Sequence, residues 1–230
     1  MSELVSIVHS WQDLIAGGLA VLAAIGGAIL LNRQIRQTEK HEQSRLSRRF
    51  NAARATLPLT LSGLCAYATS MMDELSQIRS VFNHVGDDQM PPRFNPPPPP
   101  VELVSSLQEV IEATNRDNVI DIISEIIGEM QVLSGRVAML NDETQNRHVV
   151  GLAQNVDEYM LQAARIYALA SSLFEFARRE DEMGPTEVSW ENVLSGLNLM
   201  HIRDGQFPDL FRIIERRSAR KNTVWQLSDD

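Results

Sequence analysis

The chain has 230 residues, of which 43% are hydrophobic, a formal net charge of −9 and one cysteine, Cys65. The hydrophobic content is high enough for a folded core and excludes disorder throughout. A single cysteine excludes an internal disulfide and any cysteine-based zinc site. The acidic balance argues against nucleic acid as a partner, because an acidic surface repels phosphates.

Residues 14–31, LIAGGLAVLAAIGGAILL, form a run of 18 residues without a charge. A helix of that length covers about 27 Å, close to the ~30 Å hydrocarbon layer of a bilayer. Trp11 before the run and Arg33 after it are residue types that anchor spans at the headgroups. A cleaved signal peptide is the alternative, but acidic residues precede the run and no small-residue cleavage pattern follows it. We predict one uncleaved transmembrane helix within the N-terminal segment, residues 1–31.

Lys and Arg side chains are absent before this span and frequent after it. Residues 32–57 hold seven of them against two glutamates. Because cytoplasmic flanks carry the excess of positive charge, we expect the N-terminus outside and the C-terminal part in the cytoplasm. Arginine outnumbers lysine by nineteen to two, a bias common in GC-rich bacterial genomes, so we expect a bacterial inner (plasma) membrane.

Small residues recur inside the span at four-residue intervals, at Ala16, Ala20, Ala24 and Ala28. Small side chains at this spacing let two membrane helices approach closely. The alternative is that alanine and glycine are simply common in transmembrane helices, without any role in association. Homo-oligomerisation through this strip is therefore a hypothesis.

Residues 32–45 form a polar, basic juxtamembrane neck that we expect to continue the helix into water. Cations close to an anionic membrane surface are each worth about 1 kcal/mol. The expected membrane-surface residues are Arg33, Arg36, Lys40, Arg45, Arg48 and Arg49. The alternative is that these charges serve only as the orientation signal.

The next two segments differ sharply in pattern. Over residues 46–83, apolar side chains recur at alternating steps of three and four, which predicts a long amphipathic helix with a coiled-coil-like seam. Residues 84–101 form a linker, in which residues 84–100 hold seven of the ten prolines. We favour a stiff polyproline connector, with a ligand for aromatic grooves as the alternative.

The apolar pattern of residues 102–221 predicts a helical bundle. Residues 222–230 are expected to form a C-terminal tail. No stretch shows sustained period-two alternation, so the class is all-α, an antiparallel bundle joined to the membrane helix. Thr186 is a candidate cap for the helix that begins near Trp190, and Asn141 with Asp142 interrupts an earlier one. The predicted helices lie near residues 103–111, 119–140, 149–177, 190–200 and 208–214.

We find no motif for catalysis, a cofactor or a metal, so we expect no catalytic residue, no cofactor and no metal site. Cys65, Tyr159, Tyr167 and Trp190 stand on apolar helical faces and are expected to pack rather than react. Asp117, Asp121, Glu125 and Glu129 form an acidic stripe at four-residue intervals. We favour a solvated face, with a cation or an arginine-rich partner as the alternative, and residues 216–221, RRSARK, as a basic counterpart within the chain.

These features predict a single-pass membrane protein whose helical domain acts as a non-enzymatic interaction or scaffold component. Its expected partners are membrane lipid, further copies of itself and an unidentified protein. A membrane-tethered enzyme whose site is invisible in the sequence is one alternative. A component of a membrane pore or lysis system is another.

Overall fold

The computed structural model describes the backbone of residues 2–84, 94–146 and 152–220. Side chains are described for residue 27 and for residues 30–80, 94–140 and 154–219. Two compact units divide the chain, Met1–Arg49 and Phe50–Asp230, and one long helix contributes to both.

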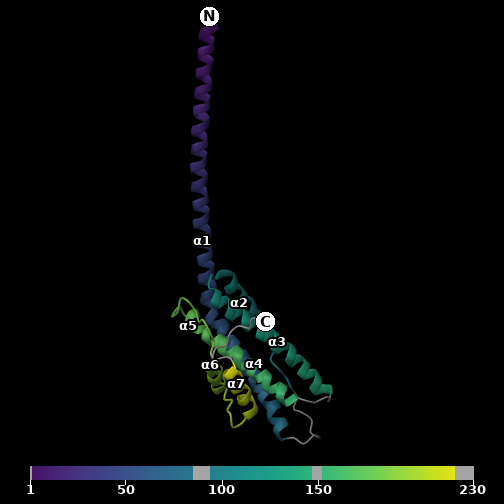
Figure 1. Ribbon diagram of the computed structural model, residues 1–230. Helices are drawn as coiled ribbons and strands as arrows, with labels where there is room; N and C mark the ends of the chain where they lie inside the picture. The colour runs from purple at the N-terminus through teal and green to yellow at the C-terminus, as the bar shows by residue number, and fades with distance from the viewer. Residues whose placement is uncertain (1, 85–93, 147–151, 221–230) are drawn as a thin grey trace. The chain divides into compact units, whose positions relative to one another are not determined.

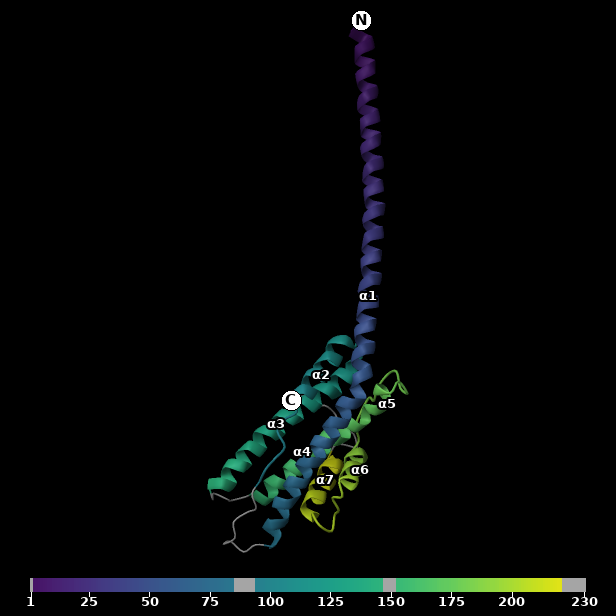
Figure 2. The ribbon, with the colours of Figure 1, turned by 180° about the vertical axis from the view of Figure 1, so that it is seen from behind.

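The described residues contain helices and no β-strand, which confirms the all-α prediction (Figures 1 and 2). The Val and Ile run at residues 119–127 is helical, as its spacing predicts. The helices are α1 (Ser2–His84), α2 (Val101–Ala113), α3 (Asp117–Asn146), α4 (Leu152–Ser172), α5 (Phe174–Ala177), α6 (Trp190–Leu199) and α7 (Pro208–Arg220).

The first unit is formed by the N-terminal part of α1, and its described side chains from residue 30 to residue 49 are all exposed. Within the described residues, no helix is both long enough and apolar enough to cross a membrane. The predicted span, residues 14–31, has a helical backbone, but its side chains other than those at 27, 30 and 31 lie outside the described residues.

In the second unit, the apolar seam of α1 is buried. Residues Leu57, Leu61, Leu64, Ala68, Met71, Leu75 and Ile78 are each at most 1% exposed. The seam therefore packs within its own folded unit and is not free to form a coiled coil with another chain.

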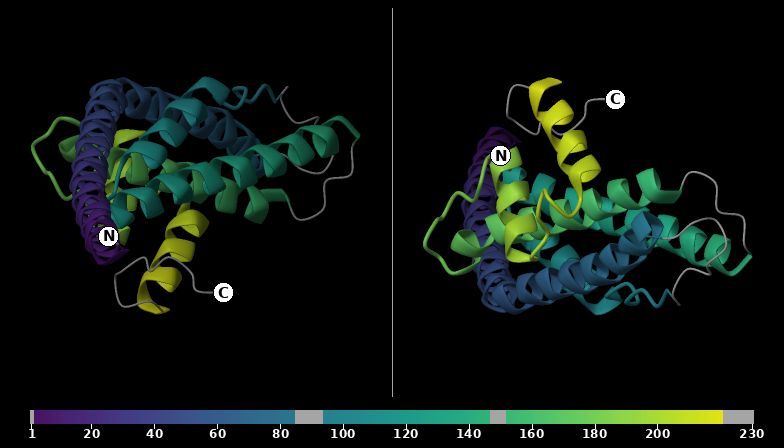
Figure 3. Two further views of the ribbon diagram at one scale, coloured as in Figure 1. Left: turned by 90° about the horizontal axis from the view of Figure 1, so that it is seen from above. Right: turned by 90° about the horizontal axis from the view of Figure 1, so that it is seen from below.

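Helix α4 lies at the centre of the second unit and packs against α3, α6 and α7 (Figure 3). Cys65 of α1 lies beside Ser171, whereas Arg79 reaches Asp157 near the other end of α4. Residue numbers thus rise along α1 as they fall along α4. The same holds between α3 and α4, where Glu125 contacts Arg165 and Glu129 contacts Gln162. Helix α4 is antiparallel to both α1 and α3, which makes α1 and α3 parallel to each other.

Three boundaries differ from the sequence predictions. Helix α3 continues through Asn141 and Asp142, because penalties below about 0.7 kcal/mol per residue do not end a packed helix. The predicted helix at 149–177 is interrupted at Leu173, between α4 and α5. Thr186 is not the cap of α6. Instead, Ser189 and Asn192 form a capping box, in which the Ser189 hydroxyl accepts from the Asn192 backbone amide and the Asn192 side chain accepts from the Ser189 backbone amide.

The segment at residues 180–186 is bound to the start of α3. The Asn118 side-chain amide donates to the carbonyls of Met183, Gly184 and Pro185 at 2.9–3.1 Å. Gly184 has a φ of +78°, and a Cβ there would lie 2.6 Å from a methyl group of Val119. Glycine is therefore required both for the backbone conformation and for the close approach.

Candidate functional site

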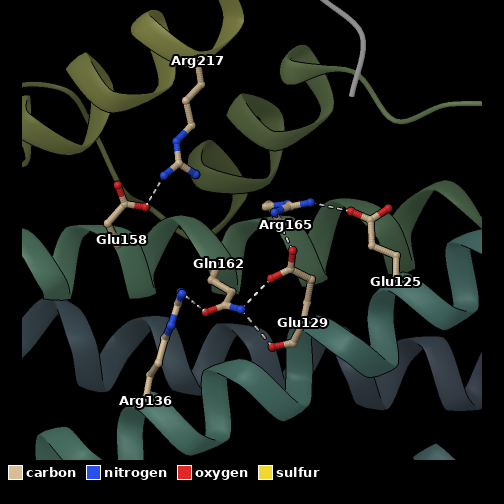
Figure 4. Close-up of polar contacts among 7 residues, drawn as sticks. All are labelled: Glu125, Glu129, Arg136, Glu158, Gln162, Arg165 and Arg217. Carbon is tan, nitrogen blue, oxygen red and sulfur yellow. Dashed lines mark hydrogen bonds and ion pairs between the residues drawn. The ribbon is translucent and has the colours of Figure 1, made fainter. Parts of the chain in front are cut away.

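Two carboxylates of the acidic stripe converge on one guanidinium from the neighbouring helix (Figure 4). Glu125 and Glu129 are one helical turn apart on α3, and both form ion pairs with Arg165 of α4. The three side chains are 11%, 14% and 19% exposed, in that order. Burial lowers the pKa of Arg165, whereas Glu129 and Glu125 act in the opposite direction and favour its charged form.

Gln162 extends this cluster along α4. Its amide nitrogen donates to the Glu129 carboxylate at 2.6 Å and to the Glu129 carbonyl at 3.2 Å. Its amide oxygen accepts from Arg136 at 3.1 Å, and the Arg136 guanidinium lies 5.9 Å from the ring centre of Tyr159. We call Glu125, Glu129, Arg136, Gln162 and Arg165 the α3–α4 polar network.

The solvated-face interpretation of the acidic stripe is therefore wrong for half of it. Asp117 and Asp121 are exposed, but the next two members are paired inside the α3–α4 interface. Within the described part of the basic segment 216–221, Arg217 pairs with Glu158 of α4 at 2.6 Å and not with the acidic stripe (Figure 4). The pairing of the stripe with α4 was not predicted from the sequence. Its signal in the sequence is Arg165, a charged residue among the apolar residues of α4, because a buried arginine requires an acidic partner.

A second buried ion pair joins α1 to α4. Arg79 Nε donates to Asp157 Oδ1 at 2.8 Å, and the two side chains are 6% and 1% exposed. Arg79 also contacts Asp209, in the first turn of α7, at 3.3 Å. Burial raises the pKa of Asp157, while Arg79 opposes that shift. One guanidinium thus fixes three helices of the unit.

Arg54 is one of the seven cations of residues 32–57, but it is only 2% exposed. Its Nε donates to the Phe176 carbonyl at 2.7 Å and Nη2 to the Asp181 carbonyl at 2.8 Å. Nη1 contacts the Glu182 carboxylate at 2.8 Å, and the guanidinium lies 4.4 Å from the Phe176 ring centre. Arg54 is a core residue that fastens α1 to the segment after α4, because its donors are satisfied there.

A shallow, open notch of about 210 Å³ lies between α4 and α7. It is lined by Gln154, Glu158, Ile213, Arg216 and Arg217. Among the described residues, no group of three or more His, Cys, Asp or Glu side chains could hold a metal ion.

The side chains expected to pack rather than react do so. Trp190 is buried, and Tyr159, Tyr167 and Cys65 pack against the core. The Cys65 Sγ lies 3.9 Å from the Ser171 hydroxyl, and burial raises the pKa of the thiol, which favours its protonated, unreactive form. These contacts confirm the packing interpretation.

The predicted membrane-facing residues fall in the first unit. The side chains of Ala16, Ala20, Ala24 and Ala28 lie outside the described residues. All six predicted membrane-surface cations are exposed on α1: Arg33, Arg36, Lys40, Arg45, Arg48 and Arg49. Arg45 contacts Glu42 at 3.8 Å, a weak pairing because both side chains are exposed. The predicted C-terminal tail, residues 222–230, also lies outside the described residues.

The chemistry of these sites is structural. Each buried carboxylate described above is bound to a guanidinium of a neighbouring helix, a charge-assisted contact that orients both side chains. No protein-family model matches the chain, and no curated protein or solved structure shows significant similarity to it.

Proposed function

We propose that this chain is a single-pass, membrane-anchored protein whose helical unit is a non-enzymatic docking platform at the cytoplasmic face of a bacterial inner membrane. The observation that carries the proposal is the uncharged run at residues 14–31, with no Lys or Arg before it and seven within residues 32–57. The buried charge pairs support the platform role, because they hold α1, α3, α4 and α7 in fixed register.

The exposed cations nearest the proposed span are the ones that reach lipid. Arg33 and Arg36 lie within about 8 Å of Leu31, measured along the helix axis. That distance is about one Debye length at physiological salt. Their positive charge stabilises an anionic headgroup layer at this end of the helix. Lys40 lies about 14 Å along the helix and contributes less.

The test is carbonate extraction of cell membranes together with reporter fusions at Asp230. We expect the full chain in the carbonate-resistant pellet and activity only from a cytoplasmic reporter. Leu19→Arg with Leu22→Arg should move the chain to the supernatant, because charges at a span centre are costly. Leu59→Arg is the matched control, since Leu59 is exposed in the second unit. Wild-type chain in the supernatant would contradict the anchor, and an active periplasmic phosphatase fusion would contradict the orientation.

A further inference from the structure

The proline-rich segment before α2 is fixed to the second unit at both ends. At its first end Phe94 is 6% exposed in the core, and the Asn95 backbone amide donates to the Glu74 carboxylate of α1 at 3.2 Å. At its other end the segment leads into α2, where Leu103 packs closely on Gly63 of α1. A Cβ at that glycine would lie 2.8 Å from a leucine methyl group. The segment therefore lies along α1 and is held there by both ends.

We call residues 94–100 the proline strap. Each residue from 95 to 99 precedes a proline, which restricts its backbone to the extended and polyproline II region, and each proline ring fixes its own φ near about −65°. The strap is therefore a short polyproline II helix, with three residues per turn and no internal hydrogen bonds. Residues three apart share an edge of such a helix. The first edge is 95 with 98, the second is 96 with 99, and the third is 97 with 100.

The exposure of the strap follows this period of three. Both residues of the third edge, Pro97 and Pro100, are half-buried, so this edge lies toward the body of the second unit. Both residues of the first edge, Asn95 and Pro98, are exposed. The second edge ends in Pro99, which is also exposed. We call the first and second edges the free edges of the strap.

A connector role does not account for the free edges. Two anchored ends require a segment of the right length, whereas an exposed proline ring buries no apolar surface in the fold. Among the described residues, the carbonyls of Pro96, Pro97 and Pro98 accept no hydrogen bond. The free edges thus present proline rings in a fixed orientation with unpaired acceptors beside them. A surface that is already ordered loses little conformational entropy on binding.

We propose that the free edges of the proline strap bind an aromatic-lined groove of a partner protein. Grooves of this kind, as in SH3 and WW domains, hold proline rings between aromatic side chains. Their Tyr hydroxyl and Trp indole groups supply donors for the carbonyls of the bound chain. A groove contacts two edges of a polyproline II helix while the third edge points away from it. In this strap the third edge is the one that already lies toward the body.

The partner is a different protein and not a second copy of this chain. Among the described side chains no Phe, Tyr or Trp is exposed, so the described surface carries no aromatic groove for another copy's strap. The inference names the partner class of the docking platform and rests on that part of the proposed function. Its evidence lies entirely within the second unit and does not depend on the membrane anchor.

Titration of isotopically labelled SH3 and WW domains with the full-length chain in detergent micelles tests the proposal. The indole NMR signal of the groove tryptophan reports binding, and we expect saturable binding by at least one domain and release by a free decaproline peptide. Pro99→Ala, on a free edge, should weaken binding at least tenfold, and Pro98→Ala on the other free edge gives an independent substitution. Pro97→Ala, on the edge that lies toward the body, is the matched control and should change binding less than twofold.

The outcomes separate the edges of the strap from the fold and from the anchor. Circular dichroism melts of the same chains should remain cooperative, because exposed prolines make no core contact. No binding of the wild-type chain by either domain would overturn the proposal, and so would equal weakening by Pro97→Ala and Pro99→Ala. Carbonate extraction is measured separately. A chain in the membrane pellet that binds neither domain contradicts the strap inference alone, whereas an extracted chain that binds contradicts the anchor alone.

Discussion

Helix α1 places the same residue type in two opposite environments within two turns. Arg48 is exposed in the first unit, whereas Arg54 is buried in the second and donates to two carbonyls and a carboxylate. Both belong to one cluster of positive charge in the sequence. The difference teaches that a count of charges does not separate exposed arginines from buried ones, whereas the apolar period around each arginine indicates whether it lies inside the fold.

Substitution at these two positions tests that contrast with the largest expected effect. Arg54→Ala should lower the free energy of unfolding by about 3 kcal/mol, because one buried and one partly buried carbonyl lose their donor and the Phe176 ring loses its stacked guanidinium. Arg48→Ala should change it by less than about 0.5 kcal/mol. Urea unfolding of the full chain, followed by circular dichroism, measures both, and equal effects would contradict the assignment of Arg54 to the core.

A second contrast is between two glycines of the folded unit. Gly184→Ala should cost about 2 kcal/mol, since alanine at a φ of +78° is strained and its Cβ would meet Val119. Gly205→Ala, where a Cβ meets nothing within 4 Å, should stay within about 0.5 kcal/mol. The same unfolding measurement applies. A smaller loss at Gly184 than at Gly205 would show that the 180–186 turn is not fixed against α3.

The helices could be predicted from the sequence wherever apolar side chains recur with helical period. The helix near residues 208–214, which is part of α7, is such a case, and the buried seam of α1 is another. The α3–α4 polar network could not be predicted from the sequence, because the pairing of Glu125 with Arg165 depends on which helices become neighbours. A period identifies the buried face of a helix but carries no information about its partner.

The predicted alanine strip extends the contrast to the first unit. Ala20→Ile with Ala24→Ile should weaken self-association of the span about fivefold in a membrane two-hybrid assay, because bulky side chains prevent close approach of two helices. Insertion should be unchanged, since both substitutions keep the segment apolar. Leu22→Ile, which keeps the same side-chain volume within the predicted span, is the matched control and should leave its association unaffected. Equal signals from wild type and double variant would show that the strip is ordinary span composition.

The smallest expected effect concerns the carboxylate that Arg54 holds at the surface. The hydrogen bond from Arg54 lowers the pKa of Glu182 below its ordinary value of 4.5. An acid whose folded-state pKa is depressed stabilises the fold above its unfolded pKa, and that contribution is lost as the pH falls through the folded value. Ionised Glu182 should therefore contribute fully near pH 7 and progressively less below about pH 4.5.

Glu182→Gln should consequently reduce the difference in unfolding free energy between about pH 7 and about pH 3, leaving the acid-side stability nearly unchanged. Glu180→Gln is the matched control, because among the described residues Glu180 forms no ion pair. Urea unfolding of the three chains at both pH values gives the comparison. An identical pH dependence for wild type and Glu182→Gln would mean that Arg54 is held by its two carbonyls and the Phe176 ring alone, with the surface carboxylate adding nothing to the fold.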